Sequence, residues 1–488
     1  MVDSGWPVAT QTPLCMYSRT PDGDFVIDFL GGEFGKNVVV GGGFSDHGFK
    51  LSPVVGRILA DLALSGEAQG VELKHFRIAS STAYQTAKRG QKTLLLEQFD
   101  FLHHRGSSHG ESRTIRATYP EDYYTPLVLQ SYKLWQQAES EIGYNVYFKA
   151  HQLDMAPAND KVLHAVVESC RKNSVPVRVM NRDQLDREFS GRVRIPEDWV
   201  AMATEHGGVI KPTKAVSMFQ TLALQNGAVL RDNMEVKGVE RDGVRGGVWV
   251  CTENGERFWG KKCVVTVGAW TTKLVKTVGG IEMPMQPLET AVCYWKIKEG
   301  HEGGFAIGGD FPTFASYGDN YIYGTPSLEY PDLIKVSMHG GYPCEPDKRP
   351  WGPGNTLAPN TLAPLKEWIE GRFSGMVDSG GPVATQTQLF WEGCGGGWRV
   401  FGSRVQAQLC MYSTTPDEDF VIDFLGGEFG KDVVVGGGFS GHGFKLSPVV
   451  GRILADLALS GEAQGVELKH FRIARFRENP KGNVKDFL

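Results

Sequence analysis

The sequence predicts an α/β fold with a second layer that is more antiparallel. From Ser80 onward, short apolar strands alternate with amphipathic helices, as in sheets that are covered by helices. Hairpin signals fall between these units and indicate antiparallel strands as well. A chain of 488 residues also has room for two or three domains with large buried cores.

Each expected element has a local signal. The first helix ends on glycine, another begins at Pro212, and Glu253-Asn254-Gly255 forms a turn between two strands. The predicted helices cover residues 81–90, 160–172, 211–226 and 445–459. The predicted strands cover residues 93–96, 144–150, 228–230, 248–251, 257–259, 263–267 and 433–435.

Composition excludes several classes of protein. The formal charge is −5 and no basic run stands out, so neither nucleic acid nor an anionic membrane is expected as a partner. The eight cysteines are scattered without a C-x-x-C pair, which favours a reducing compartment and gives no metal-type spacing. No transmembrane helix, secretory signal or clear targeting signal is visible; the last residues, Lys-Asp-Phe-Leu, are not a Ser-Lys-Leu-type address.

One segment occurs twice. Residues 14–79 and 409–474 align without a gap, and only four of the 66 positions differ. The match continues upstream between residues 1–12 and 376–387, and the second copy carries a 20-residue excess, 389–408, with neither strand alternation nor helical period. Two near-identical copies at opposite ends do not fit a solenoid, so a recent duplication or a misassembled gene model explains them better. We expect one copy to carry no function.

The repeat overlies a position where a glycine loop is expected. In nucleotide-binding α/β folds a strand, a glycine loop and a helix hold the pyrophosphate, and an acidic residue about 20 positions on binds the ribose. Helix 81–90, strand 93–96 and Glu97 match the later parts of that unit. The loop would fall at 74–79, where the sequence is Lys-His-Phe-Arg-Ile-Ala, and Phe76 would block a close approach of the backbone. The first strand and its G-x-G-x-x-G loop are therefore expected to be lost. The literal match at 436–441 lacks a suitable downstream acid and is typical of a glycine turn that caps a helix.

Five short motifs occur in a fixed order along the chain. They are 107–116 (SSHGESRTIR), 267–270 (VGAW), 323–327 (YGTPS), 410–412 (CMY) with 415–417 (TPD), and 438–445 (GFSGHGFK). Alone, the first would be a solvated polar loop. Together they resemble the monomeric sarcosine oxidase family, which includes N-methyl amino acid and pipecolate oxidases, over roughly residues 80–488 without the excess segment.

The resemblance implies a fold and its division. It implies an FAD-binding Rossmann-like domain of the glutathione-reductase type, formed by residues 80–140, 205–285 and 376–488. A second domain with an antiparallel sheet, residues 141–204 and 286–375, would bind the substrate. Residues 1–79 would be the duplicate of the segment 376–474.

The resemblance also implies residues that bind the cofactor. FAD is expected to be linked covalently to Cys410, and Cys15 has the same sequence context in the extra copy. Glu97 would bind the ribose. The residues expected to surround the flavin are Ser108, His109, Arg113, Gly438, Phe439, Gly441 and His442.

A second set of residues would act on the substrate. Arg116 and Lys445 match the pair that holds the substrate carboxylate, and Lys50 duplicates Lys445. A buried carboxylate needs such fixed positive partners. Tyr323 and His339 would shape the substrate side, and Lys335 would help the reduced flavin to react with oxygen.

The implied reaction is the oxidation of a secondary amino acid (sarcosine, an N-methyl amino acid or pipecolate) to an imine, with O2 reduced to H2O2. A monomer in the cytoplasm or the peroxisome is expected. Two alternatives stay open. The chain could be a catalytically dead or misassembled relative that does not retain FAD, as the overwritten loop favours. A nicotinamide dehydrogenase using residues 436–441 is disfavoured because the downstream acid is missing.

Overall fold

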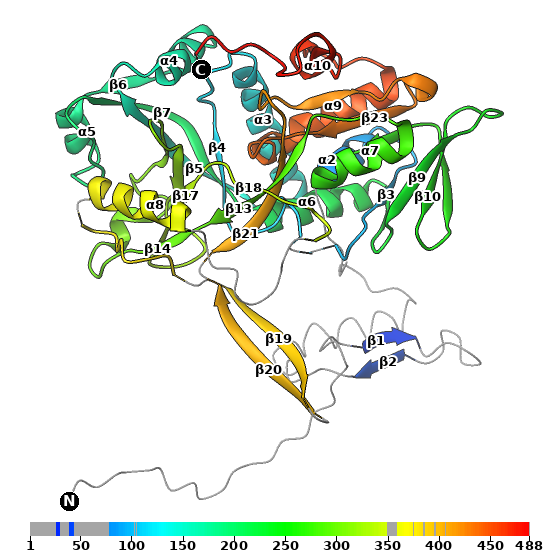
Figure 1. Ribbon diagram of the computed structural model, residues 1–488, viewed down its shortest axis with the longest axis horizontal. Coiled ribbons are helices and arrows are strands. Elements are labelled where there is room, and N and C mark those ends of the chain that lie inside the picture. Colours follow the sequence, from blue (N-terminus) through cyan, green and yellow to red (C-terminus); the bar gives the residue numbers. More distant parts are fainter. Residues whose placement is uncertain are drawn as a thin grey trace, which may run out of the picture. The chain divides into compact units, whose positions relative to one another are not determined.

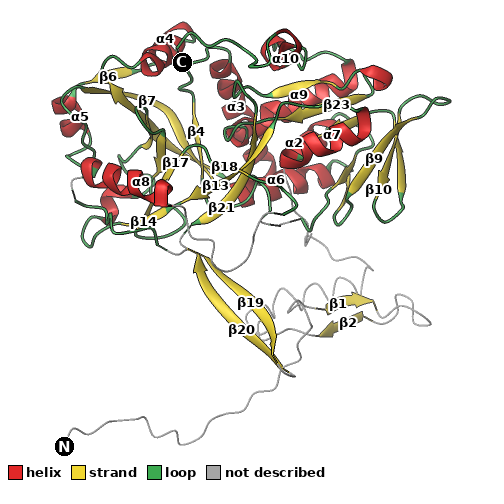
Figure 2. Cartoon of the chain, viewed as in Figure 1, coloured by secondary structure: helices red, strands yellow, loops and turns green. Residues whose placement is uncertain are grey.

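The computed structural model divides the chain into two units, residues 1–73 and 74–488. It describes residues 78–101, 103, 105–348, 359–373, 375–383, 386–394, 397–405 and 407–487, and two short strands within residues 26–42. Figure 1 labels the elements, and Figure 2 separates helices from strands by colour.

The largest element of the second unit is an eight-stranded sheet. Its order is β14-β17-β16-β15-β5-β7-β4, with β6 also paired to β7. Figure 1 labels β4, β5, β6, β7, β14 and β17 of this sheet. All of these pairs are antiparallel except β15 with β5. The strands are β4 (Arg113–Arg116), β5 (Tyr147–Pro157), β6 (Arg178–Met180), β7 (Trp199–Ile210), β14 (Tyr294–Lys296), β15 (Thr313–Ser316), β16 (Ile322–Thr325) and β17 (Leu333–Met338). The antiparallel layer expected from the sequence is therefore present.

A second layer contains the parallel strands. β3 (Leu94–Leu96) pairs in parallel with β8 (Val229–Arg231), and β12 (Cys263–Val265) pairs in parallel with β23 (Val433–Gly437). β22 (Val421–Phe424) pairs antiparallel with β23. Helices α2 (Ile78–Ala87), α6 (Pro212–Gln225) and α9 (Ser447–Ser460) lie beside these strands (Figure 2). The alternation of strands and helices confirms the α/β class.

The remaining elements complete the unit. The other helices are α3 (Tyr124–Ile142), α4 (Lys161–Lys172), α5 (Arg182–Glu188), α7 (Thr271–Gly279), α8 (Pro359–Arg372) and α10 (Arg475–Glu478). A meander contains β9 (Val236–Arg241), β10 (Val248–Thr252) and β11 (Arg257–Gly260), with the expected hairpin between the last two. A further three-stranded sheet joins β13 (Gln286–Val292) to β18 (Tyr342–Pro343) and β21 (Gln408–Thr414). Among the described residues, no helix combines the length and hydropathy needed to cross a bilayer.

A cavity of about 880 Å³ lies between the parallel pair β3-β8 and the sheet of β12, β23 and β22. Among the described residues, β3 pairs only with β8, and β12 pairs with β23 alone. The cavity is lined by Leu94–Leu96 and Cys263–Val265, by Ala79 and Ala83 of α2, and by Val250 and Phe258 of the meander. One more parallel strand between β3 and β12 would join the two sheets. Of the residues where the glycine loop was expected, only Ile78 and Ala79 are described, and they begin α2, so the loss of the loop stays a prediction.

The two copies of the repeat share one hairpin. In the first copy, β1 (Val26–Phe29) pairs antiparallel with β2 (Val39–Gly42), and Val26 lies opposite Gly42. In the second copy, Val421 lies opposite Gly437. Both pairs are related by the same shift along the chain, since 421 − 26 and 437 − 42 are both 395. The local sequence therefore specifies the register of this hairpin.

The excess segment 389–408, whose sequence has neither strand alternation nor a helical period, contains strands. Strands β19 (Gln386–Cys394) and β20 (Gly397–Val405) pair antiparallel over nine residues each. The register places Gln386 opposite Val405 and Cys394 opposite Gly397. Backbone pairing alone therefore produces strands here without alternation of polar and apolar residues in the sequence.

The domain boundaries stay a prediction. β4 and β7 belong to the same sheet as β15 to β17, although the sequence motifs place them partly with the FAD-binding segments. Strands of one sheet can serve both halves of such a protein, so the pairing does not decide the boundary.

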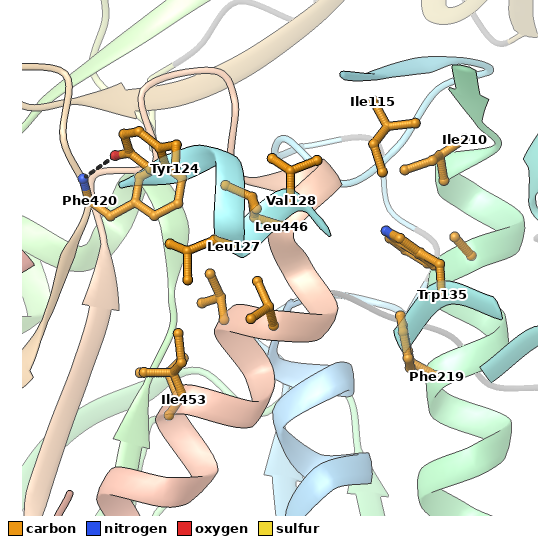
Figure 3. Packing of buried hydrophobic residues seen from close by; sticks show 14 of the residues in the cluster. Ile115, Tyr124, Leu127, Val128, Trp135, Ile210, Phe219, Phe420, Leu446 and Ile453 are labelled. Carbon is orange, nitrogen blue, oxygen red and sulfur yellow. Dashed lines mark hydrogen bonds between the residues drawn. The ribbon is translucent and has the colours of Figure 1, made fainter. Parts of the chain in front are cut away.

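The main core fixes the backbone at Lys445. Trp135 of α3 packs against Phe219 of α6, with 5.2 Å between ring centroids (Figure 3). Trp135 Nε1 and Ser131 Oγ both donate hydrogen bonds to the carbonyl oxygen of Lys445, at 3.0 and 2.8 Å. The buried aromatic cluster thereby holds the turn before α9 in place.

Candidate active site

A cavity of about 890 Å³ lies against the large sheet and the turn before α9. Most of the site residues expected from the sequence line it: Ser108, Arg113, Arg116, Tyr323, Lys335, His339, Cys410, Phe439, Gly441, His442 and Lys445. Glu97 lines the neighbouring 880 Å³ cavity, and His109 and Gly438 line neither. Cys15 and Lys50 fall outside the described residues.

Arg113 lies beside the Cys410 sulfur. Cys410 is on β21, 3 % exposed, and Arg113 Nη2 donates to its Sγ at 3.4 Å. The same guanidinium donates to the carbonyl oxygens of Ser107 and His109, at 3.0 and 2.6 Å. These bonds fold the polar segment back on itself, so that the guanidinium faces β21. A fixed cation beside a sulfur stabilises negative charge on it, and the thiolate is the nucleophilic form of cysteine.

Lys335 is a buried amine on β17. Its side chain is 2 % exposed, and Nζ donates to the carbonyl oxygen of Ser112 at 3.0 Å. Nζ also lies 5.4 Å from the ring centroid of Tyr323. Burial and the positive charge of Arg113 lower the pKa of Lys335 to about 7. Its charge can therefore change near neutral pH.

Arg116 and Lys445 form a cationic pair around Tyr119. Arg116, on β4, is 8 % exposed and Lys445 is 7 % exposed. Lys445 Nζ donates to the Tyr119 hydroxyl at 3.1 Å, and the Arg116 guanidinium carbon lies 4.9 Å from the Tyr119 ring centroid. Burial and the charge of Arg116 lower the pKa of Lys445. Neither cation forms an ion pair with a carboxylate of the described residues, so the pair suits a small anion.

His339 lines the same cavity. Its ring is 5.0 Å from that of Tyr321 and 6.1 Å from that of Tyr412, measured between centroids. Burial, Lys445 and Arg116 together lower the pKa of His339 to about 4, so the imidazole is neutral at pH 7. Gly441 has φ +76°, and a Cβ there would lie 3.1 Å from Tyr412 and 3.2 Å from His339. Glycine at this position keeps the cavity open between the two rings.

Sequence reasoning missed the tyrosines of the cavity. Tyr119, Tyr321 and Tyr412 line it, and each is bonded to the backbone or to a predicted site residue. Tyr119 stands three positions after Arg116 and Tyr412 belongs to the C-M-Y motif, so both could have been found from their neighbours. Nothing in the local sequence marks Tyr321.

The described residues fit an FAD molecule. The two cavities adjoin, because Thr266 and Trp270 line both. At the far end, Glu97 follows β3, where an acidic side chain binds ribose in dinucleotide folds. Ser80, in the first turn of α2, is fully buried, and its Oγ has no hydrogen-bond partner among the described residues. Ser80 lines neither cavity, but Ala79 of the same turn lines the 880 Å³ cavity, and the N-terminus of a helix suits a phosphate.

Comparisons with known proteins place the chain in a family. Residues 78–457 match the DAO model, described as FAD dependent oxidoreductase. The chain belongs to this family. It is an FAD-dependent oxidoreductase of mixed α/β architecture, and the match begins at the first residue of α2.

Three relatives narrow the resemblance. The chain is 63 % identical over 413 residues to a probable sarcosine oxidase from Arabidopsis thaliana, which covers 84 % of this chain and 93 % of the relative. It is 33 % identical to the human peroxisomal sarcosine oxidase, over 83 % of this chain and 95 % of the relative. It is 31 % identical to a monomeric sarcosine oxidase from a Bacillus species, over 79 % and 90 %. The resemblance to sarcosine oxidases inferred from the motifs is confirmed, whereas no relative supports a dead or misassembled protein.

Solved structures agree on the fold. The amino acid oxidase NikD has a TM-score of 0.63 at 21 % identity and covers 80 % of this chain and 93 % of its own. The L-proline dehydrogenase from P. horikoshii has a TM-score of 0.62 at 20 % identity, over 82 % and 96 %. At these identities the likeness concerns the fold alone.

Proposed function

We propose that this protein oxidises a secondary amino acid, with an N-methyl amino acid such as sarcosine as the substrate class, and passes the electrons to O2. The observation that carries the proposal is the buried pair Arg116 and Lys445 at one end of the cavity, with Cys410 and Lys335 lining the same cavity. The names of the relatives support this substrate class, since they include sarcosine oxidases and an N-methyl-L-tryptophan oxidase from Salmonella.

The carboxylate and the amine of a bound amino acid interact differently with the two cations. Arg116 and Lys445 supply charge-assisted hydrogen bonds to a carboxylate in a site with little water. The same cations disfavour a positively charged amine, and the neutral His339 adds no further charge. The carboxylate would therefore anchor at the cations, with the amine directed toward the ring side of the cavity. This arrangement orients the carbon that bears the nitrogen.

FAD, when bound, would take up the two electrons and return them to oxygen. The chain would hold it through Glu97 at the ribose and through Ser108, His109 and Arg113 at the ring. We propose further that Cys410 carries it covalently. The proximity of Arg113 to the sulfur supports this, because a thiolate is needed as the nucleophile.

The test is a spectrum of the purified full chain followed by turnover. A flavin spectrum, and peroxide formed with sarcosine or another N-methyl amino acid, is the expected result. The imine would hydrolyse, so formaldehyde is expected from sarcosine. A flavin-containing protein that produces no peroxide from sarcosine, N-methyl amino acids or pipecolate would overturn the substrate class. A protein that stays colourless after incubation with FAD would overturn the cofactor assignment.

Loss of the Arg116 guanidinium should act mainly on substrate binding. Truncating one partner of a buried charged contact costs about 2–5 kcal/mol, so R116M is expected to raise KM by a factor on the order of 30–5,000. Initial rates over a range of substrate concentrations measure this change. R182M removes an arginine whose side chain is 50 % exposed, and it should leave KM unchanged. Equal KM values for R116M and the unmodified protein would show that Arg116 does not bind the carboxylate.

The names of the relatives support a proposal for the oligomeric state and the location of this protein. We propose a monomer, by analogy with the monomeric sarcosine oxidases, and a peroxisomal location, by analogy with the human and mouse relatives. Light scattering of the purified chain and imaging of a tagged full chain test the two statements separately.

A further inference from the structure

A buried carboxylate lies behind the cationic end of the cavity. Asp154 is on β5 in the middle of the large sheet and is fully buried. It is not among the residues that line the cavity. Its Oδ1 accepts a hydrogen bond from the Tyr317 hydroxyl at 2.9 Å. A buried carboxylate is costly, so its retention in the sheet calls for a reason.

A chain of contacts runs from Asp154 to Arg116. The Tyr317 ring stacks on the Tyr321 ring, with 5.3 Å between centroids and 25° between planes. The Tyr321 hydroxyl accepts a hydrogen bond from Arg116 Nη2 at 2.8 Å. Both tyrosines line the cavity, so their rings form its wall next to the guanidinium. Because Arg116 has no ion pair among the described residues, its direction depends on such neutral contacts.

Charge supports the same assignment. Burial raises the pKa of Asp154, and the positive charge of Arg116 opposes that rise. The carboxylate and the guanidinium therefore lie close enough to interact through the low-dielectric interior without a direct ion pair. A direct pair would occupy the donors that the substrate carboxylate needs. The contact with Tyr321 uses one N–H of the guanidinium and Thr118 Oγ1 accepts another at 3.0 Å, so three of its five donors have no partner among the described residues.

We propose that Asp154 is a positioning residue for the carboxylate site: it fixes Tyr317, which fixes Tyr321, which directs the Arg116 guanidinium into the cavity. The role rests on the proposed function in one respect, namely that the substrate carries a carboxylate. It differs from the role of Arg116 because Asp154 itself touches no substrate.

Two variants remove the hydrogen bond between Tyr317 and Asp154, each by changing one of the two partners. Y317F deletes the hydroxyl and leaves the ring, and D154A deletes the acceptor. Each is expected to raise KM for the amino acid about tenfold with little change in kcat, since the loss of one buried hydrogen bond to a charged group is of that order. D154N keeps an oxygen that can accept from Tyr317, so it should restore most of the affinity. A structural defect alone would not be rescued by the amide in this way.

A binding experiment separates this role from catalysis. The full chain, loaded with FAD, is titrated with acetate by calorimetry, and the dissociation constant is compared among the variants. We expect D154A and Y317F to weaken acetate binding about tenfold in the otherwise unmodified chain. In the R116M background the same changes should have no further effect, because they act through Arg116. Equal weakening in both backgrounds, or no weakening in either, would overturn the proposal.

The acetate titration, together with an activity assay, distinguishes the positioning role of Asp154 from the proposed function. If acetate binds, D154A weakens it, and no amine is oxidised, then the positioning role stands and the proposed function fails. If the unmodified chain oxidises N-methyl amino acids and D154A leaves both KM and acetate binding unchanged, the function stands and the positioning role fails. Should D154A not fold, Y317F decides the outcome, because it preserves the packing of the ring.

Discussion

Replacing Cys410 by serine is expected to abolish covalent attachment of the flavin. After acid precipitation, the pellet of the unmodified chain should be yellow, and the pellet of C410S should be colourless with free flavin in the supernatant. The reason is chemical: a serine hydroxyl is not ionised near neutral pH and cannot replace the thiolate as nucleophile. Absorbance of the dissolved pellet measures the difference.

Two controls make this result specific. C251S changes a cysteine of β10 that lines neither cavity, and its pellet should stay yellow. C15S tests the equivalent cysteine of the first copy. A C410S pellet that is yellow and becomes colourless only in C410S/C15S would assign the link to Cys15 instead. Colourless pellets from the unmodified chain would reject covalent attachment altogether.

The parts of the fold that sequence reasoning found are those with a strong local signal. The helix expected at 211–226 is α6, Pro212–Gln225, because proline is favoured in the first helical turn. The helix expected at 160–172 is α4, Lys161–Lys172, and Asp160 accepts a hydrogen bond from the backbone amide of Leu163 at 2.7 Å. Caps of this kind depend on a few adjacent residues, so a sequence can indicate them.

The parts it missed depend on pairing between distant segments. The strands β19 and β20 were not expected, because their register is a property of the pair and not of either strand. The gap between β3 and β12 is a consequence of which strands pair with which, and no single segment carries that information. From the sequence one can predict only that a strand and its glycine loop are lost near residue 74, and this stays a prediction.

In the candidate site, too, some residues could be predicted from the sequence and others could not. Arg113, Arg116, Cys410 and Lys445 are found by their motifs, and all line one cavity. Asp154 carries no motif and lies in a strand that also contains Lys149, His151 and Gln152, and its bonded neighbour Tyr317 follows β15, far along the chain. Residues that touch a ligand tend to occur in recognisable runs, whereas a residue that acts through another is visible only when side-chain directions are known.

Replacement of Lys335 by methionine is expected to slow the reaction with oxygen more than the oxidation of the amine. Methionine has a similar length and no charge, so it removes the ammonium that stabilises negative charge as oxygen accepts electrons. Loss of one such fixed electrostatic contact costs a factor on the order of 10²–10³. The measurement is a two-step experiment: anaerobic reduction by substrate, then mixing with oxygenated buffer while the flavin absorbance returns.

The pH dependence of that second step gives an independent reading of the same residue. Burial and Arg113 lower the pKa of Lys335 to about 7, so its ammonium is present below that pH and is lost above it. The rate of reoxidation of the unmodified protein should therefore fall as pH rises through about 7. K335R keeps its charge at all these pH values and should show no such fall, because the guanidinium titrates only above pH ~12. K296M, which replaces an exposed lysine of β14, should behave like the unmodified protein. Unchanged reoxidation in K335M would assign the oxygen reaction to another group, and a K335R profile that still falls near pH 7 would assign the titration to a residue other than Lys335.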